Sequence, residues 1–144
     1  MTQPSDSATG PAVALHRSDT LFGTEYAYAA SVAPGSRLIF LAGSCPLDPA
    51  GATVGVGDFA AQAVQCLENL RSVLQDAGAG LADIVSTRIL VASSDRADLG
   101  AVWSVVREAF GDHDVPSTLL GVTVLGYEDQ LVEIEAVAAV RDPA

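Results

Sequence analysis

Hydrophobic and polar residues alternate with a period of two along residues 131–140, which is typical of a β-strand. One face of this strand carries only apolar side chains, from Val132, Ile134, Ala136 and Ala138. The opposite face carries two carboxylates, Glu133 and Glu135, between Leu131 and Val137. A strand sealed between subunits tolerates such a pair only with a compensating cation, a shared proton or a ligand. We therefore expect a site that forms between subunits when the chains associate.

Two longer segments show helical spacing instead. Asp58 is suited to cap a helix whose apolar residues recur every three or four positions over 59–77, until Gly78 ends the pattern. Asp95 precedes a second such stripe, which closes at Gly111. We expect further strands at 15–22 and 26–32, a buried strand at 37–42, strands at 84–91 and 118–124, turns at 34–36 and 126–130, and a loop at 46–57.

The predicted order is three strands, a helix, a strand, a second helix and two strands. This order indicates an α+β fold with a mixed β-sheet and both helices on one sheet face. Because nothing in the chain remains to cover the other face, we expect partner chains there. Residues 1–12 are rich in Ser, Thr, Pro and Gly and are expected to form a flexible N-terminal tail, with a single domain over 13–144.

Composition supports association and limits the partners. Hydrophobic residues make up 49% of the chain and charged residues 17%, so we expect an oligomer that hides apolar surface. The net charge of -11 opposes binding to nucleic acid and to anionic membranes, and we expect neither as a partner. No apolar stretch approaches the ~20 residues of a membrane span. The N-terminus has no basic region typical of a secretion signal, so we expect a cytoplasmic protein with reduced thiols.

The absence of lysine removes several chemistries. All seven basic residues are arginines, so neither a Schiff-base lysine nor a P-loop lysine is present. The two histidines, His16 and His113, and the two cysteines, Cys45 and Cys66, stand far apart in the sequence. This arrangement shows no metal-ligand spacing, and we expect no metal site.

Four segments of the chain resemble one known family. They are residues 38–48, 62–79, 83–85 and 116–138, and the Ala-Gly-Ser-Cys-Pro-Leu-Asp and Val-Glu-Ile-Glu-Ala sequences are the most specific parts. In these segments the chain resembles the RidA/YjgF family, the reactive-intermediate deaminases. The resemblance implies a chorismate-mutase-like fold and a homotrimer with a central β-barrel, with small-molecule clefts between subunits. It also implies hydrolysis of imines and enamines without a metal or organic cofactor.

The resemblance also places candidate site residues. Glu133 stands at the position of the family's pocket glutamate and is our candidate catalytic acid/base. The positions of the family's carboxylate-binding arginine, pocket serine, helix asparagine and pocket tyrosine fall on Thr118, Ala42, Trp103 and either Tyr28 or Tyr26. Thr118 cannot make the bidentate contact of an arginine, so 2-iminobutanoate and similar 2-imino acids are disfavoured as substrates. Trp103 is either a core residue or a side chain that stacks on a flat ligand.

Arg88 is a basic residue in the middle of a predicted strand, on a face that we assign to residues 84, 86, 88 and 90. We expect it to neutralise Glu135 or Glu133 within the sheet. The alternative is that Arg88 supplies the pocket cation that is missing at position 118.

The remaining substrate-binding candidates are Ser44, Cys45 and Ser117, which follow or precede the cleft segments. A nucleophilic Cys45 paired with His113 of a neighbouring subunit is a further alternative. We predict a homotrimer that acts on a small metabolite, by imine or enamine hydrolysis or by a related glutamate-assisted acid/base step. The alternative function is a non-catalytic, ligand-binding or chaperone-like trimer.

Overall fold

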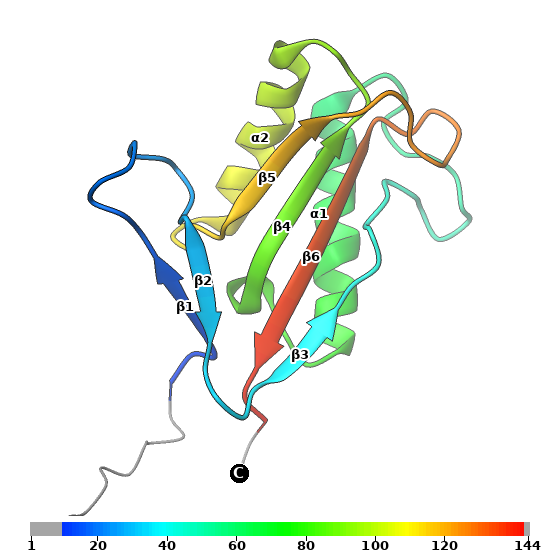
Figure 1. The fold of residues 1–144 in the computed structure, drawn as a ribbon. Helices are drawn as coiled ribbons and strands as arrows, with labels where there is room; N and C mark the ends of the chain where they lie inside the picture. Colours follow the sequence, from blue (N-terminus) through cyan, green and yellow to red (C-terminus); the bar gives the residue numbers. More distant parts are fainter. Residues whose placement is uncertain (1–9, 143–144) are drawn as a thin grey trace, which may run out of the picture.

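A four-stranded sheet carries both helices of the chain on one face (Figure 1). The computed structural model describes residues 10–142. In chain order the elements are β1 (Val13–His16), β2 (Ala29–Val32), β3 (Arg37–Phe40), α1 (Phe59–Asp76), the 3-10 helix η1 (Leu81–Asp83), β4 (Ile84–Val91), α2 (Arg96–Phe110), β5 (Ser117–Gly121) and β6 (Val132–Val140). The sheet has the order β3-β6-β4-β5, in which β4 and β5 are parallel and β6 is antiparallel to both its neighbours. The predicted mixed sheet and element order are confirmed.

Both helices begin and end where the sequence predicts. The side chains of Asp58 and Asp95 accept hydrogen bonds from backbone N–H groups in the first turns of α1 and α2, at 3.0 and 2.9 Å. Beyond the other ends, Gly78 and Gly111 have positive φ angles of 79° and 55°, which other residues adopt only with strain. The caps satisfy backbone groups that the helix itself leaves unpaired.

The core lies between the helices and β6. The residues of α1 that face the sheet are almost fully buried, as are Val132 and Ile134 of β6. Because side chains alternate along a strand, Glu133 and Glu135 lie on the opposite face, away from the helices. The predicted division of β6 into an apolar face and an acidic face is therefore confirmed.

The faces of β4 differ from the prediction. The register against β6 shifts between Ile84, which pairs with Ala138, and Ser86, which pairs with Val137. This irregularity changes the alternation, so Ile84 is buried on the helix side while Ser86, Arg88 and Leu90 lie on the open side. The prediction that Ile84 shares a face with Arg88 was wrong.

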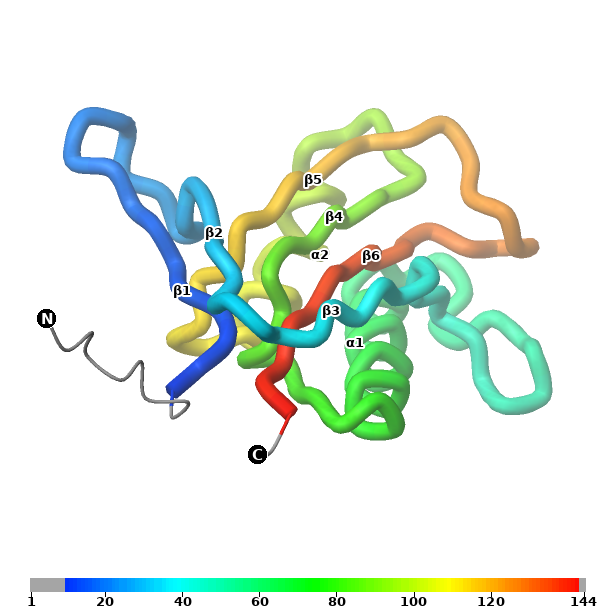
Figure 2. Tube along the Cα trace, turned by 60° about the horizontal axis from the view of Figure 1, so that its bottom comes forward, coloured from blue at the N-terminus to red at the C-terminus, as the bar shows by residue number. Residues whose placement is uncertain are grey.

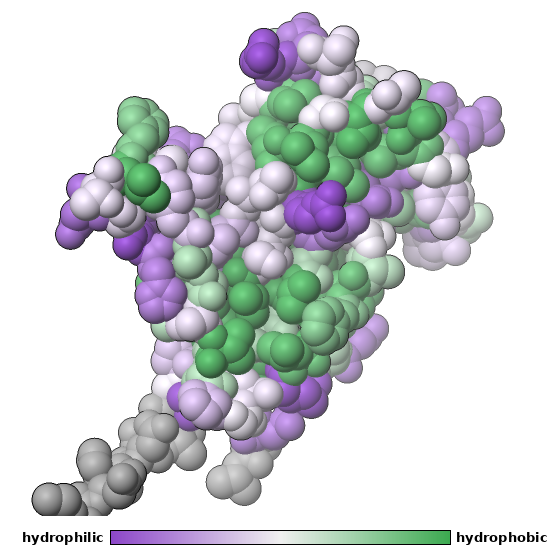
Figure 3. All heavy atoms as spheres, in the orientation of Figure 1, coloured by the Kyte–Doolittle hydropathy of each residue, from purple (hydrophilic) through white to green (hydrophobic). Residues whose placement is uncertain are grey.

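The strand predicted at 37–42 as buried is an exposed edge strand in a single chain. β3 ends at Phe40, and the exposed fractions of Leu38 and Phe40 are 47% and 76%. Leu120 on β5 is also exposed, and Val137 on β6 is half-buried. Apolar residues thus gather over the face that the helices do not cover (Figure 3), so this face can bury them only against a partner.

Three further strands are shorter than predicted. The strands predicted at 15–22 and 26–32 are reduced to β1 and β2, which form a separate hairpin with a long connection. That connection lies on the β5 side of the molecule (Figure 1 and Figure 2). It is fixed by an Arg17–Asp114 ion pair and by a 2.8 Å hydrogen bond from the Ala27 N–H to the Asp114 carbonyl. β5 ends at Gly121 instead of residue 124, and the chain there passes Ser93 so closely that a Cβ on Gly121 would lie 2.6 Å from the Ser93 carbonyl oxygen.

The first part of the predicted N-terminal tail, residues 1–9, lies outside the described residues. Ala12 is already buried beside Val13 and Ala139, and its carbonyl accepts a 2.8 Å hydrogen bond from the Ala33 N–H. Ala12, the last residue of the predicted tail, therefore packs against the domain.

Replacing Asp58 tests the cap of α1. Asp58→Ala removes the carboxylate that accepts the first-turn hydrogen bond, and we expect the free energy of unfolding to fall by about 1 kcal/mol. Urea denaturation at a fixed protomer concentration measures this loss. Asp76→Ala is the matched control: its carboxylate lies at the unfavourable end of the helix dipole, so no loss is expected. Equal losses in both variants would contradict the cap.

Candidate functional site

Glu133 lies on the open face of β6 and is partly buried. Its Oε1 atom accepts hydrogen bonds from the Cys45 thiol at 3.0 Å and from the Gln130 amide at 3.4 Å. Within residues 10–142, no hydrogen bond reaches Oε2 and no cation lies within 4.0 Å of the carboxylate. One oxygen is thus held by neutral donors while the other remains available for proton transfer.

The segment after β3 carries Gly43, Ser44 and Cys45 to this carboxylate. Ser44 and Ile134 exchange two backbone hydrogen bonds, of 2.7 and 3.0 Å, which continue the pairing of this segment with β6. A Cβ on Gly43 would lie 2.7 Å from the Cδ of Glu133. A larger residue at this position would therefore displace the Glu133 side chain from its present conformation.

The helix α1 holds the same segment from the other side. The Ser44 hydroxyl donates to the Cys66 carbonyl at 2.6 Å, so it is directed at α1. The Asn69 amide donates to the carbonyls of Cys45 and Leu47, at 2.8 and 2.9 Å. A cavity of about 290 Å³ adjoins these contacts, with Ala42, Gly43, Ser44, Cys45, Asn69 and Tyr127 in its lining.

Cys45 is a protonated thiol at neutral pH. Burial raises its pKa to about 11, and the neighbouring Glu133 carboxylate adds to the effect. His113 lies at the other end of the β4–β6 pair, where its Nε2 is 2.8 Å from the Ile84 carbonyl oxygen. Within one protomer the alternative Cys45–His113 nucleophilic pair is therefore not formed.

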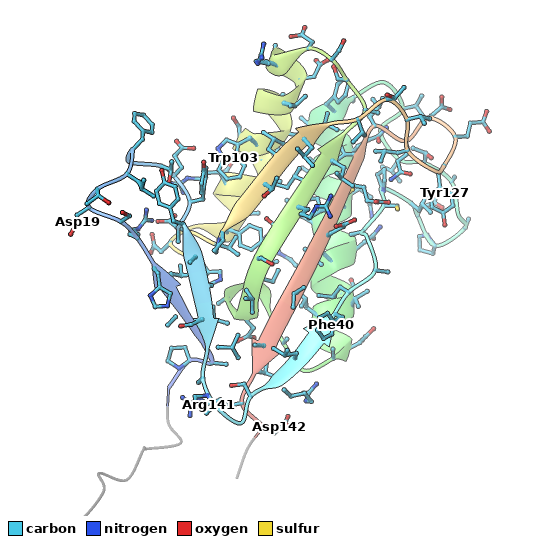
Figure 4. The ribbon with its side chains drawn as sticks, in the orientation of Figure 1. Asp19, Phe40, Trp103, Tyr127, Arg141 and Asp142 are labelled. Carbon is cyan, nitrogen blue, oxygen red and sulfur yellow. The ribbon has the colours of Figure 1, made fainter. Side chains whose placement is uncertain are left out.

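A second group of predicted residues gathers at the edge strand β5. A cavity of about 460 Å³ is lined by Tyr26, Trp103, Ser117, Thr118 and Leu119. The Trp103 indole donates to Glu25 at 2.7 Å, and its ring meets that of Tyr26 edge-on, with centroids 6.1 Å apart. Figure 4 shows Trp103 near the β5 edge of the sheet and Tyr127 near the opposite edge, so the two cavities lie at opposite edges of a protomer.

Tyr26, rather than the first candidate Tyr28, lines the cavity at β5. Tyr28 is 40% exposed and its hydroxyl donates to the Phe22 carbonyl at 2.6 Å. The Ser117 hydroxyl is also engaged, since it accepts from Thr87 at 2.7 Å and donates to Val115 at 3.0 Å. The structure thus favours Tyr26 within a protomer and leaves Ser117 in a structural role.

Arg88 faces Glu135 across β4 and β6. The two residues are register partners, and Arg88 Nη1 lies 3.7 Å from Glu135 Oε2. On its other side Arg88 is the register partner of Thr118 on β5. The predicted neutralisation of Glu135 is therefore observed, and the ion pair lines a shallow cavity of about 190 Å³ on the open sheet face.

Two buried glutamines hold the turn before β6 and were missed in the sequence. The fully buried Gln62 donates to the carbonyls of Gly55 and Asp129 and accepts from the Leu131 N–H, at 3.2, 2.9 and 2.7 Å. A polar residue within the apolar stripe of 59–77 was the signal that could have revealed it. Gln130, which contacts Glu133, follows a residue with positive φ and carries no comparable signal.

Two further findings concern residues 10–142. In this range, no group of three or more His, Cys, Asp or Glu side chains is arranged to hold a metal ion. Neither described α-helix has the length and apolar character required to cross a bilayer.

Comparisons with known protein sequences agree on one family. The family described as "Endoribonuclease L-PSP" matches residues 21–140. A RutC family protein of Pyrococcus horikoshii is 33% identical over 111 residues, which cover 77% of this chain and 85% of the relative. The 3-aminoacrylate deaminase RutC of Acinetobacter baylyi is 34% identical over 104 residues, covering 72% and 80%.

Solved structures agree with the sequence relatives. The Rid family protein YyfB of Yersinia pestis superposes with a TM-score of 0.84 at 28% identity, over 90% of this chain and 99% of that protein. A YjgF family member from Mycobacterium tuberculosis has a TM-score of 0.62 at 33% identity, over 89% and 99%. The predicted α+β fold is thereby confirmed, and the chain belongs to the endoribonuclease L-PSP family, the RidA/YjgF family that its sequence resembles.

Proposed function

We propose that the protein is a homotrimer that hydrolyses imines or enamines of small metabolites, with Glu133 as the acid/base. The observation that carries this proposal is the Glu133 carboxylate, which neutral donors hold by one oxygen while the other has no partner among the described residues. The RutC relative is named for deamination of 3-aminoacrylate, which is an enamine. This relationship supports the same class of reaction here.

The chemistry needs one group that both accepts and returns a proton. Water adds to the imine carbon while Glu133 takes a proton from the water, and the same carboxyl group returns that proton to the nitrogen. In the resulting carbinolamine Glu133 takes the hydroxyl proton and passes it to the amino nitrogen, so that the C–O bond becomes a carbonyl as the C–N bond breaks and ammonia leaves. An enamine first gains a proton on carbon and loses one from nitrogen, which converts it to the imine. The Cys45 thiol and the Gln130 amide keep the carboxylate oriented through these steps.

Assembly would join groups that one protomer keeps apart. The Glu133 group lies beside the segment that follows β3, whereas Tyr26 and Trp103 line the cavity at β5. Repeated contacts between one edge of a protomer and the other edge of the next form a closed ring when the rotation between neighbours divides a full turn evenly. The exposed apolar side chains of the open face support such a ring, because association buries them.

The lining at β5 supports a small, partly apolar substrate. Two aromatic rings and Leu119 form its walls, and position 118 supplies a hydroxyl group in place of a cation. Strand β5 therefore offers no bidentate contact to the carboxylate of a 2-imino acid. The net charge of -11 favours a small molecule over RNA, whose phosphates the chain would repel.

Glu133→Gln tests the catalytic proposal. Imines are generated in situ by oxidases from a panel of amino acids and amines, and semicarbazide traps whatever is not hydrolysed. We expect wild-type protein to divert at least one imine from the trap, and Glu133→Gln to lower this rate by about 10²–10⁴ with unchanged molecular mass. Glu68→Gln is the matched control, because it makes the same change at an exposed carboxylate of α1 outside the proposed site and should retain full turnover. Full activity of Glu133→Gln would contradict the role of Glu133, and no diversion by wild-type protein would leave the non-catalytic alternative.

Phe40→Asp tests the assembly. Light scattering on wild-type protein should give a mass of three 14.7 kDa protomers. We expect Phe40→Asp to produce monomers, because it places a charge on the apolar open face. Val64→Asp is the matched control, since Val64 is an exposed apolar residue on α1 and its replacement should leave the mass unchanged. A monomeric wild-type protein would refute the trimer.

Alkylation of Cys45 tests its protonation state. Because its pKa is raised to about 11, the thiol should react with iodoacetamide at pH 8 much more slowly than an exposed cysteine. Glu133→Gln removes the charge that helps to raise this pKa, so the reaction at pH 8–9 should become faster. Mass spectrometry after timed quenching measures both rates, and the buried Cys66 should stay unmodified. An identical Cys45 rate in the two proteins would show that Glu133 does not influence the thiol.

A further inference from the structure

We infer that Arg88, together with the Thr118 hydroxyl, binds a carboxylate group of the substrate. The inference rests on the proposed function, because it places this anion in the same cleft as Glu133. It goes further by specifying the charge of the substrate. The cation comes from the central strand β4 and is accompanied by a hydroxyl group from β5.

The guanidinium of Arg88 has unused hydrogen-bonding capacity. It makes no hydrogen bond with any of residues 10–142, and its sole ionic contact there, with Glu135, is 3.7 Å long. The distance is beyond the normal range of an N–H···O hydrogen bond. The side chain is 59% exposed, so the guanidinium remains accessible to a ligand.

Thr118 stands directly beside Arg88 in the sheet. The two are register partners on parallel strands, which lie about 4.8 Å apart. Both side chains belong to the open face, and the Thr118 hydroxyl has no hydrogen-bond partner within residues 10–142. A carboxylate lying over this pair can accept two guanidinium hydrogen bonds and one from the hydroxyl.

Charge distinguishes Arg88 from its surroundings. It is the one basic residue on the two central strands, β4 and β6, of a chain with a net charge of -11. Of the other arginines, Arg17, Arg37 and Arg107 form ion pairs away from this face. A small organic anion that reaches the middle of the open face therefore meets Arg88 as the cation of the two central strands.

Arg88 is also correctly spaced from the acid/base. It pairs with Glu135, so Glu133, two residues away on β6, is its diagonal neighbour at about 7–8 Å between Cα atoms. A carboxylate held by Arg88 would place an adjacent C=N group within reach of Glu133. The spacing suits a short imino or enamino acid whose carboxylate binds Arg88 on β4. Thr118 on β5 alone would offer this carboxylate no charge.

Binding of pyruvate, compared with its uncharged amide, tests the inference without any turnover. Calorimetry on wild-type protein should show pyruvate binding at least about tenfold more tightly than pyruvamide, as expected for a charge-assisted contact. Arg88→Gln should weaken pyruvate binding by about tenfold or more and leave pyruvamide binding unchanged. Arg71→Gln is the matched control, because it removes an equally exposed charge on α1 and should alter neither ligand.

Several outcomes would overturn the inference. They are equal binding of the two ligands by wild-type protein, no measurable pyruvate binding, and unchanged pyruvate affinity in Arg88→Gln. If Arg88→Gln fails to assemble, Arg88→Lys decides: an assembled lysine variant must still prefer pyruvate over pyruvamide. Charge-dependent pyruvate binding without hydrolysis of any imine would refute the proposed function alone, whereas hydrolysis with an Arg88-independent KM would refute only the carboxylate contact.

Discussion

A sheet that packs helices on one face only must keep its other face polar or cover it by association. In this chain α1 and α2 bury one side of β6 and β4, and the opposite side combines exposed apolar residues with Glu133, Glu135 and Arg88. Neither purely solvent-exposed nor purely buried surfaces have this composition. It fits an interface that also holds a polar ligand, and each functional proposal here derives from that uncovered face.

The position of Glu133 depends on backbone pairing more than on its own contacts. The Ser44–Ile134 bridge brings Gly43 and Cys45 against β6, and the absence of a Cβ at Gly43 creates the space that the carboxylate fills. The amides of Asn69 and Gln62 secure the adjoining segments from α1. The Glu133 side chain is therefore held by a framework that α1 stabilises, although α1 lies on the other face of the sheet.

The sequence predicted those features that local physics determines. Asp58 and Asp95 marked the helix starts, and the alternation along β6 assigned its two faces, because caps and strand periodicity depend on neighbouring residues. Several features that depend on tertiary contacts were not predicted. The register shift in β4 reversed the side of Ile84, and the choice of Tyr26 over Tyr28 depends on how the loop is tied to Asp114. Gln130 gained its role only through the turn that brings it to Glu133.

The relation between Thr118 and Arg88 shows why register matters for function. Thirty residues separate them in the sequence, and position 118 considered alone lacks the charge that holds a carboxylate. In the sheet they are immediate neighbours, so the guanidinium of Arg88 on β4 can reach a ligand that contacts Thr118 on β5. Because Glu135 approaches Arg88 without a hydrogen bond, the ion pair can hold the guanidinium near one orientation while its donors remain accessible. The proposed carboxylate contact therefore comes from a group one strand away from position 118, in the same row of the sheet and on the same face.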